Sequence, residues 1–116
     1  IDLSKLLFLL AKNHEELEAI TQNLSITTFR YVPNNFKISL NDKESYLNKL
    51  NQELLNELQT GGELFLSNAI VNEIFCLRTW IVNFRTSKKD IEEIIDIIIR
   101  DGRKTHSKLQ EQKMNL

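Results

Sequence analysis

Three segments of the chain carry apolar residues at the spacing of an amphipathic α-helix. They cover residues 2–12, residues 42–59, and a stretch that runs from a cap at Thr86 or Ser87 to Gly102. Glycine favours helix C-termini, so we expect the third helix to end at Gly102. The three apolar stripes consist of Leu3, Leu6, Leu7 and Leu10, of Tyr46, Leu47, Leu50, Leu54 and Leu58, and of Ile91, Ile94, Ile95 and Ile98.

Other segments predict β-strands by their alternation and by their β-branched and aromatic residues. Residues 24–32 form one such strand, and residues 64–71 and 74–84 form two more that are joined by a two-residue turn. Residues 16–20 fit neither a helix nor a strand, so the local pattern leaves them open. After the first helix the order is strand, helix, hairpin, helix, which is typical of an α+β fold with helices on one face of an antiparallel sheet.

Arg78 stands in the middle of the most apolar predicted strand. With period-2 alternation it shares a face with Cys76, Trp80, Val82 and Phe84, and the opposite face is also mainly apolar. A guanidinium stays protonated, and its burial without an anion is costly. We therefore expect Arg78 to be buried and paired with a carboxylate from this chain, from a neighbouring domain or from a ligand.

The size and composition indicate one ordinary globular domain. The chain has 116 residues, and its 41% of hydrophobic and 27% of charged residues argue against a disordered chain. A net charge of −1 predicts no binding to nucleic acid, and no basic amphipathic segment indicates a membrane surface. We see neither an apolar run long enough to cross a bilayer nor a signal peptide, and we therefore expect a cytoplasmic protein.

The residue types that usually carry chemistry are isolated from one another. Cys76 is the only cysteine, which excludes an internal disulfide and a cysteine-based zinc site. His14 and His106 stand apart, and Glu16 and its acidic neighbours are typical of a solvated face. We predict no catalytic residue, no metal site and no cofactor site in this chain. Residues 105–116 are polar and have little periodicity, so we expect a frayed or disordered tail.

Three segments are informative through their order and spacing. They read T-F-R-Y-V-P at 28–33, Y-L-N-K-L-N-Q-E-L-L at 46–55 and C-L-R-T-W-I-V-N-F-R-T-S-K-K-D-I at 76–91. Together they resemble the C-terminal domain of the pyridoxal-phosphate-dependent amino-acid decarboxylases that include the aromatic-amino-acid, glutamate and tyrosine enzymes. The resemblance covers about residues 6–104. It implies a small domain over residues 1–104, a four-stranded antiparallel sheet, and a β-β-α-β-β-α order after the N-terminal helix, with a strand at residues 16–20.

The resemblance also implies a longer parent protein in which another domain carries the catalytic residues. The Schiff-base lysine of these enzymes lies in a His-Lys motif of a large cofactor domain, and no His-Lys pair occurs here. The chain opens in mid-pattern, as a piece of a longer protein would. We therefore expect a homodimeric parent that uses pyridoxal phosphate to decarboxylate an amino acid, and a fragment that holds no cofactor and is inactive alone.

Two alternatives for Arg78 stay open under the resemblance. In glutamate-type members the matching arginine helps to hold a substrate carboxylate. Arg78 would otherwise pair with a carboxylate of the large domain or of the neighbouring subunit.

Two other functions fit the same fold. The chain could be a non-catalytic interaction module that docks through the face of Cys76, Trp80, Val82 and Phe84. It could also be the small domain of another pyridoxal-phosphate enzyme, such as an aminotransferase or a deaminating oxidase, because the small domain does not choose which bond is broken.

Overall fold

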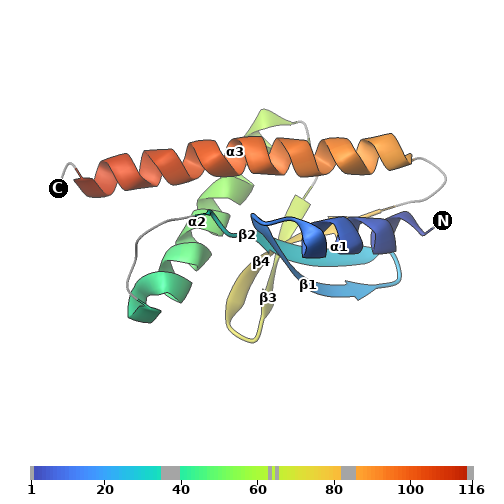
Figure 1. Ribbon diagram of the computed structural model, residues 1–116, viewed down its shortest axis with the longest axis horizontal. Helices are drawn as coiled ribbons and strands as arrows, with labels where there is room; N and C mark the ends of the chain where they lie inside the picture. Colours follow the sequence, from blue (N-terminus) through green and yellow to red (C-terminus); the bar gives the residue numbers. More distant parts are fainter. Residues whose placement is uncertain (1, 35–39, 63, 65, 82–85, 115–116) are drawn as a thin grey trace.

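The computed structural model describes residues 2–34, 40–62, 64, 66–81 and 86–114, and within them it has three helices and a four-stranded sheet (Figure 1). This confirms the predicted α+β fold and the β-β-α-β-β-α order after an N-terminal helix. Residues 16–20, which the local pattern left open, lie largely in a strand, as the resemblance implied. The elements are α1 (Leu3–Asn13), β1 (Leu17–Asn23), β2 (Ile26–Tyr31), α2 (Leu40–Gly61), β3 (Leu66–Val71), β4 (Ile74–Trp80) and α3 (Lys88–Met114).

The sheet consists of two antiparallel hairpins in the order β1-β2-β4-β3. The β3–β4 turn places Asn72 and Glu73 at φ 50° and 69°, which is the geometry of a two-residue hairpin turn. In the β1–β2 turn Leu24 takes φ 53°, so β2 starts two residues later than the alternation predicted. The predicted end of the last strand falls on residues 82–85, which lie outside the described residues.

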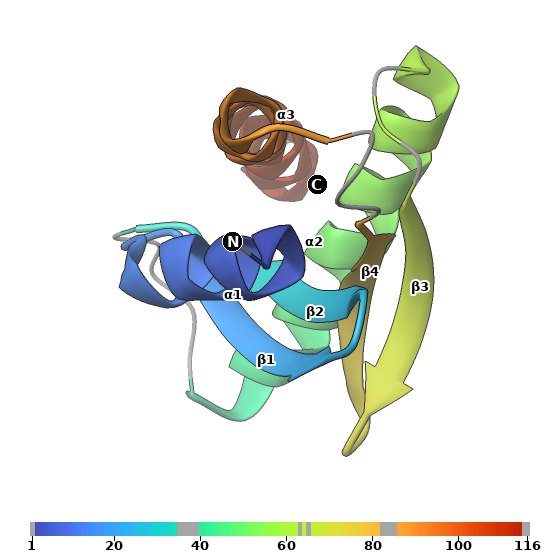
Figure 2. The same cartoon turned by 90° about the vertical axis from the view of Figure 1, so that its right-hand side faces the viewer.

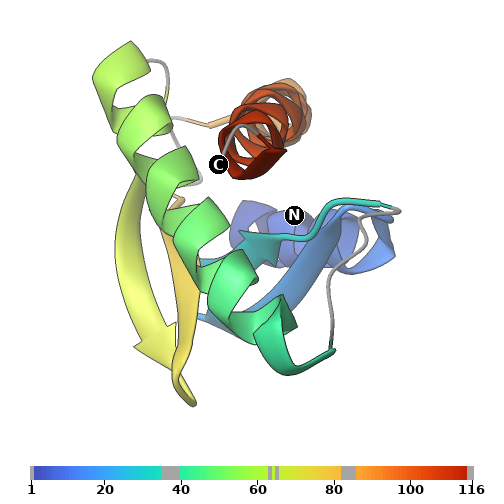
Figure 3. The ribbon, with the colours of Figure 1, turned by 90° about the vertical axis from the view of Figure 1, so that its left-hand side faces the viewer.

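The two hairpins separate along part of their length, and α2 crosses the opening (Figure 3). The β2–β4 pairs run from Ile26 opposite Trp80 to Phe29 opposite Leu77. Beyond them, Asn51 accepts a hydrogen bond from the Tyr31 N–H at 2.7 Å and donates one to the Tyr31 carbonyl at 3.0 Å.

Asn48 makes the matching contacts on the other side of the opening. Its Oδ1 accepts a hydrogen bond from the Phe75 N–H at 3.0 Å, and its Nδ2 donates to the Glu73 carbonyl at 3.3 Å. Two side chains of one helix thus bind backbone groups that a neighbouring strand would otherwise pair. A buried backbone group without a partner is costly, so these asparagines allow the sheet to open.

The helices cover one face of the sheet, as predicted. Figure 2 shows α1 against the β1–β2 hairpin, with α3 lying above α1 and beside α2. None of the described helices has an apolar run long enough to span a membrane. The core between the helices and the sheet includes Leu7, Phe29, Leu47, Leu50, Leu54, Leu77, Ile91 and Ile98.

The third helix begins as predicted but does not end as predicted. Ser87 and Asp90 cap it reciprocally, with each backbone N–H donating to the side chain of the other residue. It continues through Gly102, and residues 105–114 of the expected tail are helical. A Cβ at Gly102 would lie 2.8 Å from the Tyr31 ring, so this glycine permits close packing and is not a helix stop.

Candidate functional site

Arg78 lies on the sheet face that the helices leave uncovered. Its side chain is exposed, and its Nε donates a hydrogen bond to Ser67 Oγ at 3.0 Å. Among the residues that the structure describes, no carboxylate pairs with it. The prediction that Arg78 is buried is therefore wrong for this chain. Cys76 on the same face is buried, but from Arg78 onward only the opposite face of β4, with Leu77 and Thr79, is covered.

A large apolar side chain is also exposed near Arg78. Trp80, two residues further along β4, is 70% exposed. The strand register places Ile26 directly opposite Trp80 and Thr28 directly opposite Arg78. This end of the outer face thus presents an unpaired cation beside an exposed indole, which together suit a surface that carries both apolar groups and a carboxylate.

The buried arginine of this sheet is Arg30, which is 5% exposed. Its Nε donates to Glu18 of β1, and its two terminal nitrogens donate to the two oxygens of Glu44 in α2, at 2.8 and 3.3 Å. The hydrogen bond from Arg30 lowers the pKa of Glu44. Arg30 therefore has the environment that was predicted for Arg78, a guanidinium out of water and held by carboxylates, and it ties β1, β2 and α2 together.

A second buried charge lies where β1, β2 and α3 meet. Glu16, predicted to lie on a solvated face, is only 5% exposed. It accepts a hydrogen bond from the Tyr31 hydroxyl at 3.0 Å and another from Arg103 Nη2 at 2.7 Å. The contact with Arg103 lowers the pKa of Glu16, and burial together with Glu16 raises the pKa of Tyr31. Glu16 stays ionised and Tyr31 stays protonated at neutral pH, so the pair has no tendency to exchange protons.

The histidines and the cysteine do not form a chemical site. His106 Nδ1 lies 2.6 Å from the Tyr46 hydroxyl, whereas His14 Nδ1 accepts a hydrogen bond from the Glu16 N–H at 3.0 Å. Burial lowers the pKa of His106 and raises the pKa of Cys76, which disfavours a reactive thiolate. Within the described ranges no three His, Cys, Asp or Glu side chains gather as a metal site would require.

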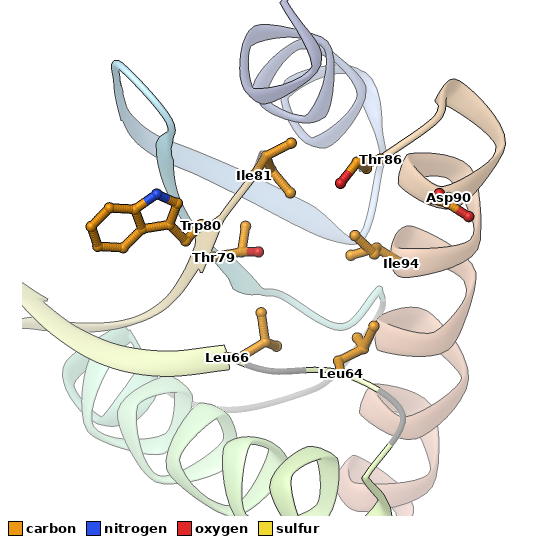
Figure 4. Close-up of a pocket in the computed structure, with 8 residues that line it drawn as sticks. All are labelled: Leu64, Leu66, Thr79, Trp80, Ile81, Thr86, Asp90 and Ile94. Carbon is orange, nitrogen blue, oxygen red and sulfur yellow. The ribbon is translucent and has the colours of Figure 1, made fainter. Parts of the chain in front are cut away.

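A pocket of about 260 Å³ lies between the end of β4 and the start of α3 (Figure 4). Its walls include Leu64, Leu66, Ile81 and Ile94, and Figure 4 shows the Trp80 ring turned away from these residues. The one carboxylate in its lining, Asp90, is occupied in capping α3. The pocket is therefore mainly apolar and holds no pair of groups suited to acid–base work.

A family model described as the PDXDC1-like second central domain matches residues 9–110 of the chain. The chain belongs to this family. No curated protein sequence matches it. The PDXDC1-like domain is thus recognised by a model that covers most of the sequence, and solved structures show which larger proteins share its fold.

Three solved structures illustrate the likeness. The glutamate decarboxylase domain of diaminobutyrate-pyruvate transaminase and L-2,4-diaminobutyrate decarboxylase from Vibrio parahaemolyticus is 20% identical, with a TM-score of 0.74 over 88% of this chain and 20% of that one. Oryza sativa TDC, solved with PLP, is 17% identical, with a TM-score of 0.74 over 87% and 21%. Mouse CSAD in apo form is 17% identical, with a TM-score of 0.76 over 86% and 22%.

These likenesses confirm that the PDXDC1-like domain has the fold of one part of such decarboxylase chains, as the sequence resemblance predicted. The chain spans about a fifth of the length of these solved chains. Its fold therefore corresponds to a part of them and not to the whole.

The pattern of single residues missed both buried ion pairs. Glu18 lies opposite Arg30 because the register of the β1–β2 hairpin shifts by one residue between Ala19 and Thr21. A regular hairpin centred on residues 24 and 25 would have placed Tyr31 opposite Glu18, so the sequence alone does not pair Glu18 with Arg30. Arg103 is 87 positions from Glu16, and no local spacing relates the two.

Proposed function

We propose that this chain is the small, C-terminal-type domain of a pyridoxal-phosphate-dependent amino-acid decarboxylase, a carboxy-lyase. It packs against a large cofactor-binding domain of the same parent chain, shapes one side of the substrate entrance and braces a cytoplasmic homodimer. The support is the family match over residues 9–110 together with a fold shared with decarboxylase chains five times as long. The predicted boundary near residue 104 remains a prediction, and α3 runs past it to Met114.

The described residues do not fit a pyridoxal-phosphate site of their own. A lysine that forms a Schiff base is usually desolvated so that its amine is uncharged, and none of the described lysines is buried. The turns Leu24-Ser25 and Asn72-Glu73 close hairpins and offer no glycine-rich cradle for a phosphate. The lysine, the cofactor and the bond-breaking step therefore belong to the large domain in this proposal.

Arg78 is the residue most suited to bind a group that lies outside this domain. Its guanidinium is exposed and lacks a carboxylate partner among the described residues. We propose that a carboxylate of the large domain or of the neighbouring subunit pairs with it, and that the amino-acid substrate is the second candidate. An exposed cation without a carboxylate partner among the described residues supports both partners.

The full-length parent protein tests the proposed function. We expect the purified parent to carry the visible absorbance of bound pyridoxal phosphate and to release carbon dioxide from an amino acid. A parent that binds the cofactor but forms a transamination or deamination product would be another enzyme that depends on it. A parent with neither property would leave the interaction module as the remaining function.

A further inference from the structure

The β1–β2 turn and the end of β4 form an exposed apolar corner of the sheet. We define the hairpin corner as Leu24, Ile26 and Trp80. Leu24 is 83% exposed and Trp80 is 70% exposed, and Ile26 is the strand partner of Trp80. Exposed leucine is common, but an indole, a leucine and a half-buried isoleucine in one place are typical of an interaction surface.

Leu24 is held in a backbone conformation that leucine disfavours. Its φ of 53° is left-handed, a region in which hairpin turns use asparagine or glycine. With 83% of its surface exposed, the side chain makes few contacts that could offset this strain. A glycine would suit the turn of the isolated domain better, so the described residues give no structural reason for leucine at this position.

The start of the chain lies beside the same corner. Gln22 Nε2 donates to the Leu24 carbonyl at 2.8 Å and lies 3.4 Å from Ser4 Oγ in the first turn of α1. Figures 1 and 2 both show the N-terminus at the end of the molecule where the β1–β2 hairpin turns. Any chain that precedes residue 1 therefore joins the domain next to the hairpin corner.

We propose that the hairpin corner docks into an apolar groove on the domain that precedes this chain in the parent protein. This inference rests on the proposed function, in which that domain is the large cofactor domain. Leu24 and Trp80 insert into the groove, and a carboxylate at its rim faces Arg78, which lies two residues from Trp80 on the same sheet face. Indole and leucine anchors beside a charged rim are the usual composition of a docking site.

Hydroxyl-radical oxidation of the full-length parent, read by mass spectrometry, tests the docking. We expect Trp80 to react at least about fivefold more slowly than a freely exposed tryptophan. Ile70, which is 64% exposed near the opposite hairpin turn, serves as the internal reference and should react freely. A Trp80 that reacts as an exposed residue in the parent overturns the proposal.

A matched pair of variants separates docking from turn strain. Leu24→Gly and Asn72→Gly both place glycine at a left-handed position of a hairpin turn, but only Leu24 belongs to the corner. We expect Leu24→Gly to raise the oxidation rate of Trp80 in the parent about threefold or more, and Asn72→Gly to leave it unchanged. If Trp80 stays protected in Leu24→Gly, the leucine is no anchor and the proposal fails.

Further outcomes show which of the two proposals is wrong. Protection of Trp80 that disappears on dilution indicates a second copy of the protein as the occupant and overturns docking within the chain. Protection in a parent that binds no pyridoxal phosphate sustains the docking and contradicts the enzyme. A decarboxylating parent with a freely reacting Trp80 gives the reverse result, so the two proposals fail separately.

Discussion

Gly102 shows how a single missing methyl group sets the distance between two elements. It lies inside α3, where the chain passes over the Tyr31 ring, and an added Cβ would meet three ring carbons at 2.8–2.9 Å. Because neither the ring nor the helix backbone can move without disturbing the core, we expect Gly102→Ala to destabilise the fold by about 1–3 kcal/mol. Thermal or denaturant unfolding measures this change.

Gly61→Ala is the matched control for that experiment. Gly61 is the last residue of α2, and a Cβ there would meet nothing within 4 Å. Its replacement should leave the stability unchanged or raise it slightly, since alanine favours a helix. If both substitutions changed the free energy of unfolding equally, the close packing of α3 on Tyr31 would not be the reason for glycine at position 102.

Glu16 makes the stability of the fold depend on pH. Its pKa is lowered in the folded state, chiefly by the hydrogen bond from Arg103, so it stabilises the fold above its unfolded pKa of 4.5 and loses this contribution as the pH falls through the folded value. We expect Glu16→Gln to lower the melting temperature by a few degrees at pH 7. Below pH 4.5 the difference in melting temperature between this variant and the unchanged chain should shrink.

Glu15→Gln is the control for that titration, because Glu15 is the exposed neighbour of Glu16. Melting curves from pH 7 to pH 3 should show little difference between this variant and the unchanged chain. A Glu16→Gln variant that differed equally from the unchanged chain at pH 3 and at pH 7 would contradict the assignment, since the lost contribution would then not involve ionisation.

Single-residue patterns predicted the presence of a buried, carboxylate-paired arginine but assigned it to the wrong residue. The alternation in β4 could not reveal that the outer face of the sheet is uncovered at Arg78, and it therefore predicted a buried Arg78. Arg30 stands in β2, whose residues are almost all buried, and its partners Glu18 and Glu44 come from β1 and α2. Only the hairpin register and the path of α2 identify them, and neither is a local property.

At the scale of elements, α2 takes the place of a strand. Asn51 satisfies the N–H and the carbonyl of Tyr31, and Asn48 does the same for groups of the β3–β4 hairpin. We expect Asn51→Ala to cost about 2–4 kcal/mol, because two buried backbone groups lose their partners. Urea unfolding measures the loss, with Gln52→Ala, its exposed neighbour on the same helix, as the control. A cost for Asn51→Ala as small as that of the control would mean that water replaces the amide.

The elements themselves were largely predictable, because helix and strand periods are local. The apolar stripes located all three helices, and the turn at Asn72 and Glu73 followed from the spacing of two strands. The end of α3 was not predictable, because a glycine that stops a helix and a glycine that admits a neighbouring ring look alike in sequence. The weak periodicity of residues 105–116 predicts a tail, yet residues 105–114 are helical and Thr105 is buried.

At the scale of the whole molecule, Arg78 tests which part of the parent this domain serves. Under the proposed function, we expect Arg78→Met in the full-length parent to leave the substrate affinity within about twofold. The melting temperature should fall by several degrees, since we assign the partner of Arg78 to the protein. Arg100→Met, an exposed arginine on α3, is the control and should change neither quantity. A large loss of affinity with unchanged melting would make Arg78 a substrate clamp.

The short seam between the two hairpins has a consequence for how the chain acquires its fold. Each hairpin joins residues that are close in sequence, whereas the four β2–β4 pairs join residues about 50 positions apart. Closing so large a loop is entropically expensive until other contacts offset it, and such non-local pairings slow folding. The hairpins should therefore form early and independently, and the seam should close last, when α2 brings its two asparagines between them.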